Sequence, residues 1–211
     1  LVNLLADDMR AVNAMIMKRL SSDVPLIPEL AGHLIAAGGK RIRPMMTLAG
    51  AKITLNTDSK KDAIIGLATA VEFIHSATLL HDDVIDESNL RRGRDTANSV
   101  WGNEASVLVG DFLFARAFEL MVQAGDINVL GRLANASAQI TEGEIKQMTI
   151  AGRPDTPQSV YLDVITGKTA ILFAAAAAAG AQIAGAKTDD VLVMHDYGLK
   201  LGLAFQIMDD A

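Results

Sequence analysis

The chain has 211 residues, of which half are apolar and only 4% aromatic, and it contains no cysteine. Such a chain is expected to form one domain with a sizeable core, without disulfides or thiolate metal sites, in a reducing compartment such as the cytoplasm. Its formal net charge of −6 argues against binding of nucleic acid and against electrostatic docking on anionic lipid.

Helical patterns follow one another along the chain, and no alternating strand pattern of convincing length interrupts them. Gly38 and Gly39 are expected to end a short helix, and Pro44 suits the first turn of the next one. A turn is expected at 56–59 and a polar loop at 91–98. The expected helices cover residues 1–20, 29–37, about 44–53, 61–87, 103–124, 127–150, 158–166, 168–185 and 188–210. The sequence therefore predicts an all-α protein.

No transmembrane segment is predicted from the apolar runs. The longest of them, at 171–181, falls short of the roughly 20 residues that cross a bilayer. It is also mostly alanine, which is only weakly hydrophobic. The six alanines at 174–179 instead predict a helix face that packs very closely against a neighbouring helix.

The end of the helix at 61–87 carries an acidic cluster that is directly followed by a basic one. Asp82 and Asp86 are four residues apart, so their carboxylates share one face of a helix. Close carboxylates repel one another unless a cation lies between them, and Mg²⁺ usually shares such oxygen ligands with waters and substrate phosphates. Arg91, Arg92 and Arg94 are natural partners of such a phosphate. The stretch therefore indicates a metal-bridged diphosphate, although a solvated helix end beside a basic turn is an equally common interpretation.

Two further features favour the metal-bridged diphosphate. Asp209 and Asp210 form a second acidic pair, again at the end of an apolar helix. Lys40, Arg41 and Arg43 lie on a glycine-containing turn at a helix start, where outward N–H groups and the helix dipole attract an anion. A solvated basic loop is the alternative for this turn. It is less favoured because the protein is otherwise acidic.

Two residues on other apolar helices are weaker candidates. Gly167 is expected to loosen its helix so that Lys168 can reach a phosphate, but a plain surface lysine fits equally well. His75 lies seven residues before Asp82 and so shares its helix face. A core histidine with one hydrogen bond is the more common interpretation of such a residue.

Six motifs together make the chain resemble a known family. They are GGKRIRP at 38–44, DDVID at 82–86 with RRG at 91–93, GDFLFARAF at 110–118, GEIKQ at 143–147, GKT at 167–169 and FQIMDD at 205–210. The chain is similar to the trans-prenyl diphosphate synthases, in particular the long-chain polyprenyl diphosphate synthases that supply quinone side chains. The resemblance covers 1–211 as one polyprenyl synthase domain, and it implies a helical bundle of the isoprenoid synthase type around a central apolar cavity.

The resemblance also implies roles for individual residues. An isopentenyl diphosphate site would consist of Lys40, Arg43, His75 and Arg92. The allylic diphosphate would be held by Arg91, Lys168, Thr169 and Gln206. Mg²⁺, as three ions once substrate is bound, would join this diphosphate to Asp82, Asp83, Asp86 and Asp209, with Asp83 and Asp210 as supporting members of the two motifs. Asp82, Asp86, Lys168 and Asp209 are the catalytic candidates.

The implied reaction ionises the allylic diphosphate, joins the resulting cation to the double bond of isopentenyl diphosphate and then loses a proton. The growing tail would run along the helix before Asp82, past Thr78, Ala77 and Ile74. Ala77 and Thr78 are small, and a helix of about 20 residues is about 30 Å long, so a product of about forty to fifty carbons is expected. A ubiquinone side chain is its expected use.

The resemblance further implies a homodimer, with its interface expected on the helix at 106–121, and transient membrane contact for product release. In the family, the second acidic motif continues beyond Asp210 and further helices follow, so these 211 residues are expected to be an inactive fragment. Two rival functions stay open. A class I terpene cyclase uses the same metals but needs more aromatic residues. A non-catalytic subunit of a heteromeric synthase would tend to lose the aspartates.

Overall fold

The computed structural model describes residues 1–36, 38–54, 58–153 and 155–211. Its helices are α1 (Ala6–Arg19), α2 (Leu26–Ala36), α3 (Ile42–Ala51), η1 (Asp58–Lys60), α4 (Lys61–Ile85), α5 (Ala97–Trp101), α6 (Asn103–Gln123), α7 (Ile127–Ile150), α8 (Gln158–Ile165), η2 (Thr166–Ala170), α9 (Ile171–Ile183) and α10 (Thr188–Asp209). The strands β1 (Leu90–Arg91) and β2 (Arg94–Asp95) form a small antiparallel hairpin. The prediction of an all-α protein is confirmed.

Most helix positions agree with the sequence patterns, and the differences are local. Helix α2 begins at Leu26, before the expected start, because Pro28 lies in its first turn, where a missing N–H group costs nothing. The expected polar loop at 91–98 contains most of the β hairpin, which begins at Leu90, and the beginning of α5. Ala37 and the first half of the expected turn at 56–59 lie outside the described residues, and the second half belongs to η1.

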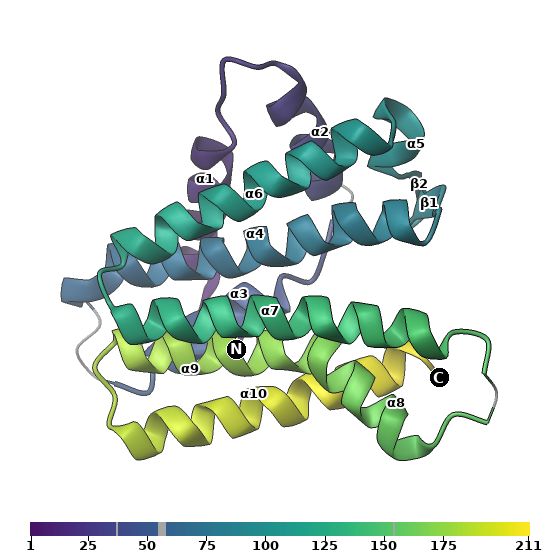
Figure 1. Ribbon diagram of the computed structural model, residues 1–211. Coiled ribbons are helices and arrows are strands. Elements are labelled where there is room, and N and C mark those ends of the chain that lie inside the picture. The colour runs from purple at the N-terminus through teal and green to yellow at the C-terminus, as the bar shows by residue number, and fades with distance from the viewer. Residues whose placement is uncertain (37, 55–57, 154) are drawn as a thin grey trace.

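Helix α4 is the central element and lies beside α6 (Figure 1). It is buried along most of its length, which explains its nearly continuous apolar sequence. By length and composition it could cross a membrane, as could the continuous helical stretch Gln158–Ile183, but 72% and 83% of their most apolar windows are buried inside the protein. Both are core helices of this fold.

Helix α9 packs against its neighbours almost backbone to backbone. The six alanines at 174–179 are all buried, as the sequence predicted. A Cβ atom on Gly180 would lie 1.8 Å from the carbonyl oxygen of Thr47 on α3, and one on Gly50 would lie 2.1 Å from that of Ala177. Small side chains on both helices therefore let α3 approach α9 closely.

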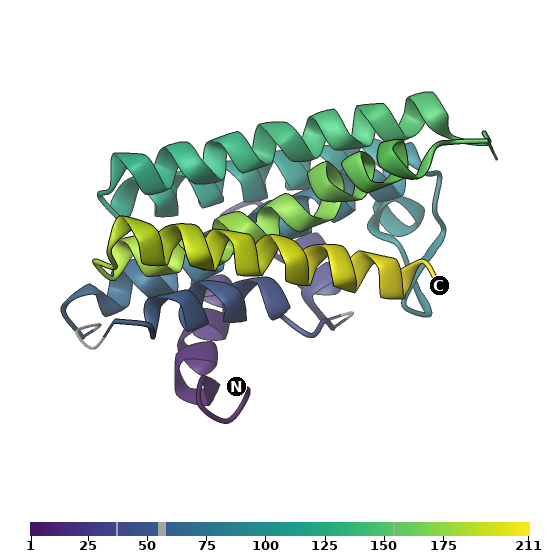
Figure 2. The ribbon, with the colours of Figure 1, turned by 90° about the horizontal axis from the view of Figure 1, so that it is seen from below.

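The carboxyl ends of α4, α7 and α10 lie at the same end of the bundle in both views (Figures 1 and 2). These three ends carry the first acidic motif, the 143–147 motif and the second acidic motif. Beside them the helix from α8 to α9 widens into the single π turn η2 instead of breaking at Gly167. Such π turns often mark functional sites. The fold thus gathers at one end segments that are far apart in the sequence.

Candidate active site

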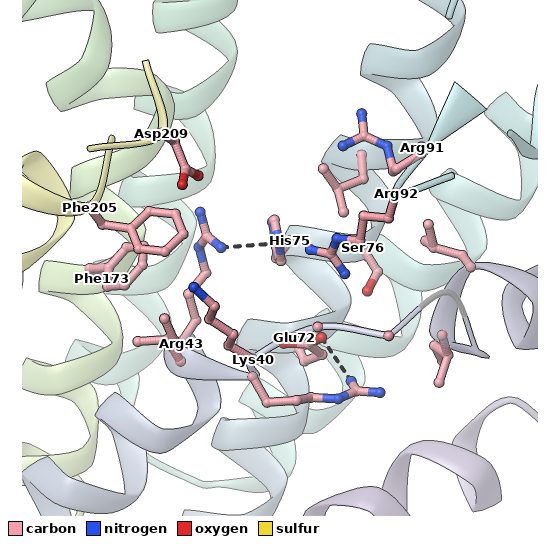
Figure 3. A pocket seen from close by; sticks show the side chains of 17 residues that line it. Lys40, Arg43, Glu72, His75, Ser76, Arg91, Arg92, Phe173, Phe205 and Asp209 are labelled. Atoms are coloured by element: carbon pink, nitrogen blue, oxygen red, sulfur yellow. Dashed lines mark hydrogen bonds and ion pairs between the residues drawn. The ribbon is translucent and has the colours of Figure 1, made fainter. Parts of the chain in front are cut away.

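A cavity of about 470 Å³ opens between the turn before α3, one face of α4, the β hairpin and the last turns of α10. Five cationic residues line it, namely Lys40, Arg41, Arg43, Arg91 and Arg92. Glu72 and Asp209 are the acidic residues in its described lining, and Phe173 and Phe205 contribute an aromatic side (Figure 3). The excess of positive charge suits this cavity to a multiply charged anion.

Arg43 and His75 face each other across this cavity (Figure 3). Arg43 Nη1 donates to His75 Nε2 at 3.0 Å, and its guanidinium stacks over the ring of Phe173 at 4.6 Å. Burial and the nearby arginines, Arg43 first, hold the pKa of His75 well below its usual range, so its ring is neutral and accepts this hydrogen bond. Burial lowers the pKa of Arg43 to about 10, which leaves Arg43 charged at neutral pH.

Arg91 makes a forked contact with Asp83 on α4. Its Nε donates to the two carboxylate oxygens at 2.9 and 3.1 Å, and its Nη2 donates to Oδ1 at 2.7 Å. Asp83 is only 1% exposed. A metal ion at Asp83 would therefore compete with Arg91, and the metal role that the sequence suggested for Asp83 stays a prediction.

Asp82 lies on the neighbouring face of α4, close to carboxylates. Burial, followed by the repulsion of Glu144 and Asp86, raises the pKa of Asp82 to about 7. Lys168 Nζ donates to Glu144 Oε2 at 2.8 Å, so this lysine lies among the same charges. A divalent cation would relieve the repulsion, which fits the predicted Mg²⁺ site.

The protein supplies only part of a metal site by itself. Among the described residues, no three histidine, aspartate or glutamate side chains lie close enough together to hold a metal ion. Mg²⁺ usually completes its shell with waters and substrate phosphates. The donor set therefore fits a metal that binds together with a diphosphate.

A chain of hydrogen bonds links the remaining predicted residues. Thr169 Oγ1 donates to Gln206 Oε1 at 2.7 Å, and Gln206 Nε2 donates to Asp210 at 2.9 Å. Tyr161 donates to the other carboxylate oxygen of Asp210 at 2.7 Å. A second cavity of about 750 Å³ touches Lys168 and Gln206 and extends towards Ile150 and Val164. The predicted allylic residues on η2 and α10 are thus neighbours.

The predicted chain-length residues lie deeper on α4. Ile74 and Ala77 have no exposed surface, and the Thr78 hydroxyl donates to the carbonyl oxygen of His75 at 2.8 Å. None of the three lines the cationic cavity. Their place beside the product tail stays a prediction.

Sequence reasoning missed two residues at the site, Glu72 and Phe173. Glu72 forms an ion pair with Arg41 in the cavity wall, and Phe173 lies under Arg43. Glu72 could have been noticed, because it is a charged residue one turn before His75 in an otherwise apolar stretch. Phe173 carried no such signal, since it lies in an apolar run.

The chain is similar to known proteins in both sequence and structure. A sequence profile of the family described as polyprenyl synthetase matches residues 24–211. Octaprenyl diphosphate synthase of Escherichia coli (strain K12) is 46% identical over 207 residues, which cover 98% of this chain and 63% of that protein.

Two solved structures superpose closely on the chain. A polyprenyl synthase from Caulobacter crescentus CB15, complexed with calcium and isoprenyl diphosphate, has a TM-score of 0.95 and 54% identity over 99% of this chain and 63% of that one. A decaprenyl diphosphate synthase from Rhodobacter capsulatus has a TM-score of 0.92 and 54% identity over 99% of this chain and 64% of that one. The predicted isoprenoid synthase-type fold is confirmed, and the chain spans less than two thirds of the length of these relatives.

Proposed function

The chain belongs to the polyprenyl synthetase family, and we propose that it carries the diphosphate-binding and metal-binding part of a long-chain trans-polyprenyl diphosphate synthase. The enzyme would condense isopentenyl diphosphate with an allylic diphosphate such as farnesyl diphosphate. The observation that carries this proposal is the cavity with five cationic side chains, which lies next to the acidic ends of α4 and α10.

The cationic cavity would hold isopentenyl diphosphate. Lys40, Arg43 and Arg92 would bind its diphosphate, while His75 keeps Arg43 oriented through their hydrogen bond of 3.0 Å. The apolar side chains of Phe173 and Phe205 would face the isopentenyl group. A neutral His75 adds no positive charge, so it serves as an acceptor for Arg43 while the arginines and the lysine attract the anion.

The allylic diphosphate would lie against Lys168, Thr169 and Gln206, with Arg91 on its other side. Asp82, Asp86 and Asp209, with Asp83 and Asp210 supporting, would hold Mg²⁺, which would supply positive charge for the leaving group. Lys168 would exchange its contact with Glu144 for the diphosphate and stabilise the same charge. The double bond of isopentenyl diphosphate then attacks the allylic cation, and the departing diphosphate accepts the proton.

The number of metal ions, the product length and the oligomeric state are proposed from the sequence resemblance. Three Mg²⁺ ions would be present with substrate bound. The product would have about forty to fifty carbons, since α4 is long and Ala77 and Thr78 are small. The product would serve as a ubiquinone side chain. The enzyme would be cytoplasmic and would contact the membrane transiently to release the product. A homodimer would form through residues 106–121 of α6, whose Leu108 and Phe118 are 67% and 44% exposed.

The direct test is incorporation of labelled isopentenyl diphosphate by the full-length protein with farnesyl diphosphate and Mg²⁺. Asp82→Asn should lower turnover about 10²–10³-fold, since it removes a carboxylate that would hold the Mg²⁺ acting on the leaving group. Asp196→Asn is the matched control, because Asp196 pairs with Lys200 on the exposed surface of α10. A cyclic hydrocarbon product would favour a terpene cyclase, and diphosphate binding without incorporation would favour a non-catalytic subunit.

A further inference from the structure

Glu72 is out of place in a cavity that is suited to an anion. It lies one turn before His75 on α4 and lines the same cavity as Lys40, Arg43 and Arg92. Its side chain is only 12% exposed. A carboxylate here repels a bound diphosphate, so its charge alone makes anion binding weaker.

The charge of Glu72 is used in an ion pair with Arg41. Arg41 Nη1 donates to Glu72 Oε1 at 2.7 Å, and the Arg41 side chain is only 17% exposed (Figure 3 marks this pair). Such a poorly solvated ion pair is screened far less than a surface pair. It connects the turn before α3 to the middle of α4.

The backbone of Arg41 needs such a restraint. Arg41 precedes α3 with φ of 49° and ψ of 36°, a left-handed conformation that is unfavourable for residues other than glycine. A residue is held in such a conformation when its surroundings determine it more strongly than its own preference. The ion pair with Glu72 supplies this restraint. Lys40 directly precedes Arg41 and Arg43 follows it two residues later, and both line the cavity.

From these contacts we propose that Glu72 is a positioning residue for the cationic cavity, acting through Arg41. The carboxylate holds Arg41, and Arg41 fixes the turn so that Lys40 and Arg43 bind the same diphosphate. The inference rests on the proposed binding of isopentenyl diphosphate in this cavity and assigns Glu72 a role in that binding.

Repulsion and positioning by Glu72 change the dissociation constant of isopentenyl diphosphate in opposite directions, so one measurement separates them. Glu72→Gln keeps the size of the side chain and removes its charge. If repulsion dominates, isopentenyl diphosphate binds more tightly to the variant. If positioning dominates, as we propose, the dissociation constant measured calorimetrically on the full-length protein rises about tenfold, because the charged hydrogen bond to Arg41 is lost. An unchanged or tighter constant overturns the proposal.

A second variant keeps the test decisive. Arg41→Met removes the other partner and should weaken isopentenyl diphosphate binding to a similar extent, and the double variant should bind no more weakly than either single one. Additive losses would overturn the pairing, since they would mean that each residue binds the substrate independently. If Glu72→Gln does not fold, Arg41→Met alone decides, and binding as tight as in the wild type would overturn the proposal.

Two further measurements distinguish a positioning role of Glu72 from a nonspecific loss of structure. Asp196→Asn makes the same chemical change in an exposed ion pair of α10 and should leave binding unchanged. The KM for the allylic substrate should change less than twofold in Glu72→Gln, because Lys168 and Thr169 lie on η2. An equal rise in both KM values would contradict the proposal. Failure of the wild-type protein to bind isopentenyl diphosphate would instead contradict the proposed function.

Discussion

Arg91 holds the carboxylate of Asp83 in a fork, with hydrogen bonds of 2.7, 2.9 and 3.1 Å. Asp83 thus differs from its neighbour Asp82, although both belong to one acidic motif. The carboxylate of Asp83 is bound by Arg91, whereas the carboxylate of Asp82 lies near other carboxylates. We therefore expect different roles for the two adjacent aspartates: Asp83 would hold the β hairpin through Arg91, and Asp82 would bind cations.

Asp83→Asn should lower the free energy of unfolding by about 2 kcal/mol, because it breaks a largely buried ion pair. The Mg²⁺ concentration needed for half-maximal turnover should change little. Asp86→Asn should leave the free energy of unfolding nearly unchanged and raise the Mg²⁺ concentration needed for half-maximal turnover. Asp86 is exposed and lies a turn after Asp82. Urea denaturation and Mg²⁺ titration of both variants provide the check. A large Mg²⁺ effect in Asp83→Asn would show that Asp83 is a direct ligand.

His75 should make the protein less stable in acid. Because burial lowers the folded-state pKa of His75, the unfolded chain binds a proton more readily below its usual value of about 6.5. The stability is therefore present above that value and is lost as the pH falls below it. Between pH 6.5 and 5.5 the wild type should lose about 1 kcal/mol more than His75→Gln, which cannot titrate. Denaturant unfolding at several pH values measures this, and parallel curves would refute it.

Gly143→Ala should disturb the lysine of η2. A Cβ atom on Gly143 would lie 2.6 Å from the backbone nitrogen of Lys168, so the π turn would have to move. We expect a loss of about 1–3 kcal/mol in stability and a lower turnover. Gly131→Ala on the same helix is the matched control, because its added methyl group meets nothing within 4 Å. Equal thermal unfolding of the two variants would contradict the packing argument.

Ala77→Phe should shorten the product, since it places a bulky ring where the tail is proposed to run. Ala77 has no exposed surface, so this variant also risks overpacking the core. Thr78→Phe is the companion variant at a partly exposed position one residue on. Chromatography of the extracted prenyl chains measures both. Unchanged product length in two folded variants would remove these residues from the channel.

The sequence predicted the helices well because long apolar or amphipathic runs are separated by short polar segments, several of which carry glycine or proline. It also indicated Lys40, Arg43, His75 and Arg92, which line one cavity in the structure. It did not reveal that Arg91 is bound to Asp83 or Lys168 to Glu144. Such pairs join segments distant in sequence, and no local pattern specifies which charge meets which. The left-handed backbone conformation of Arg41 could not be predicted either, because nonglycine residues rarely adopt it.

The central claim is metal-dependent chain elongation at this site. The decisive measurement supplies the full-length protein with labelled isopentenyl diphosphate, farnesyl diphosphate and Mg²⁺, and then sizes the extracted prenyl chains with and without a chelator. We expect chains of about forty to fifty carbons, a length consistent with a tail along the long helix α4, and no chains with chelator. Equal incorporation with chelator, or no incorporation in the presence of Mg²⁺, would contradict it.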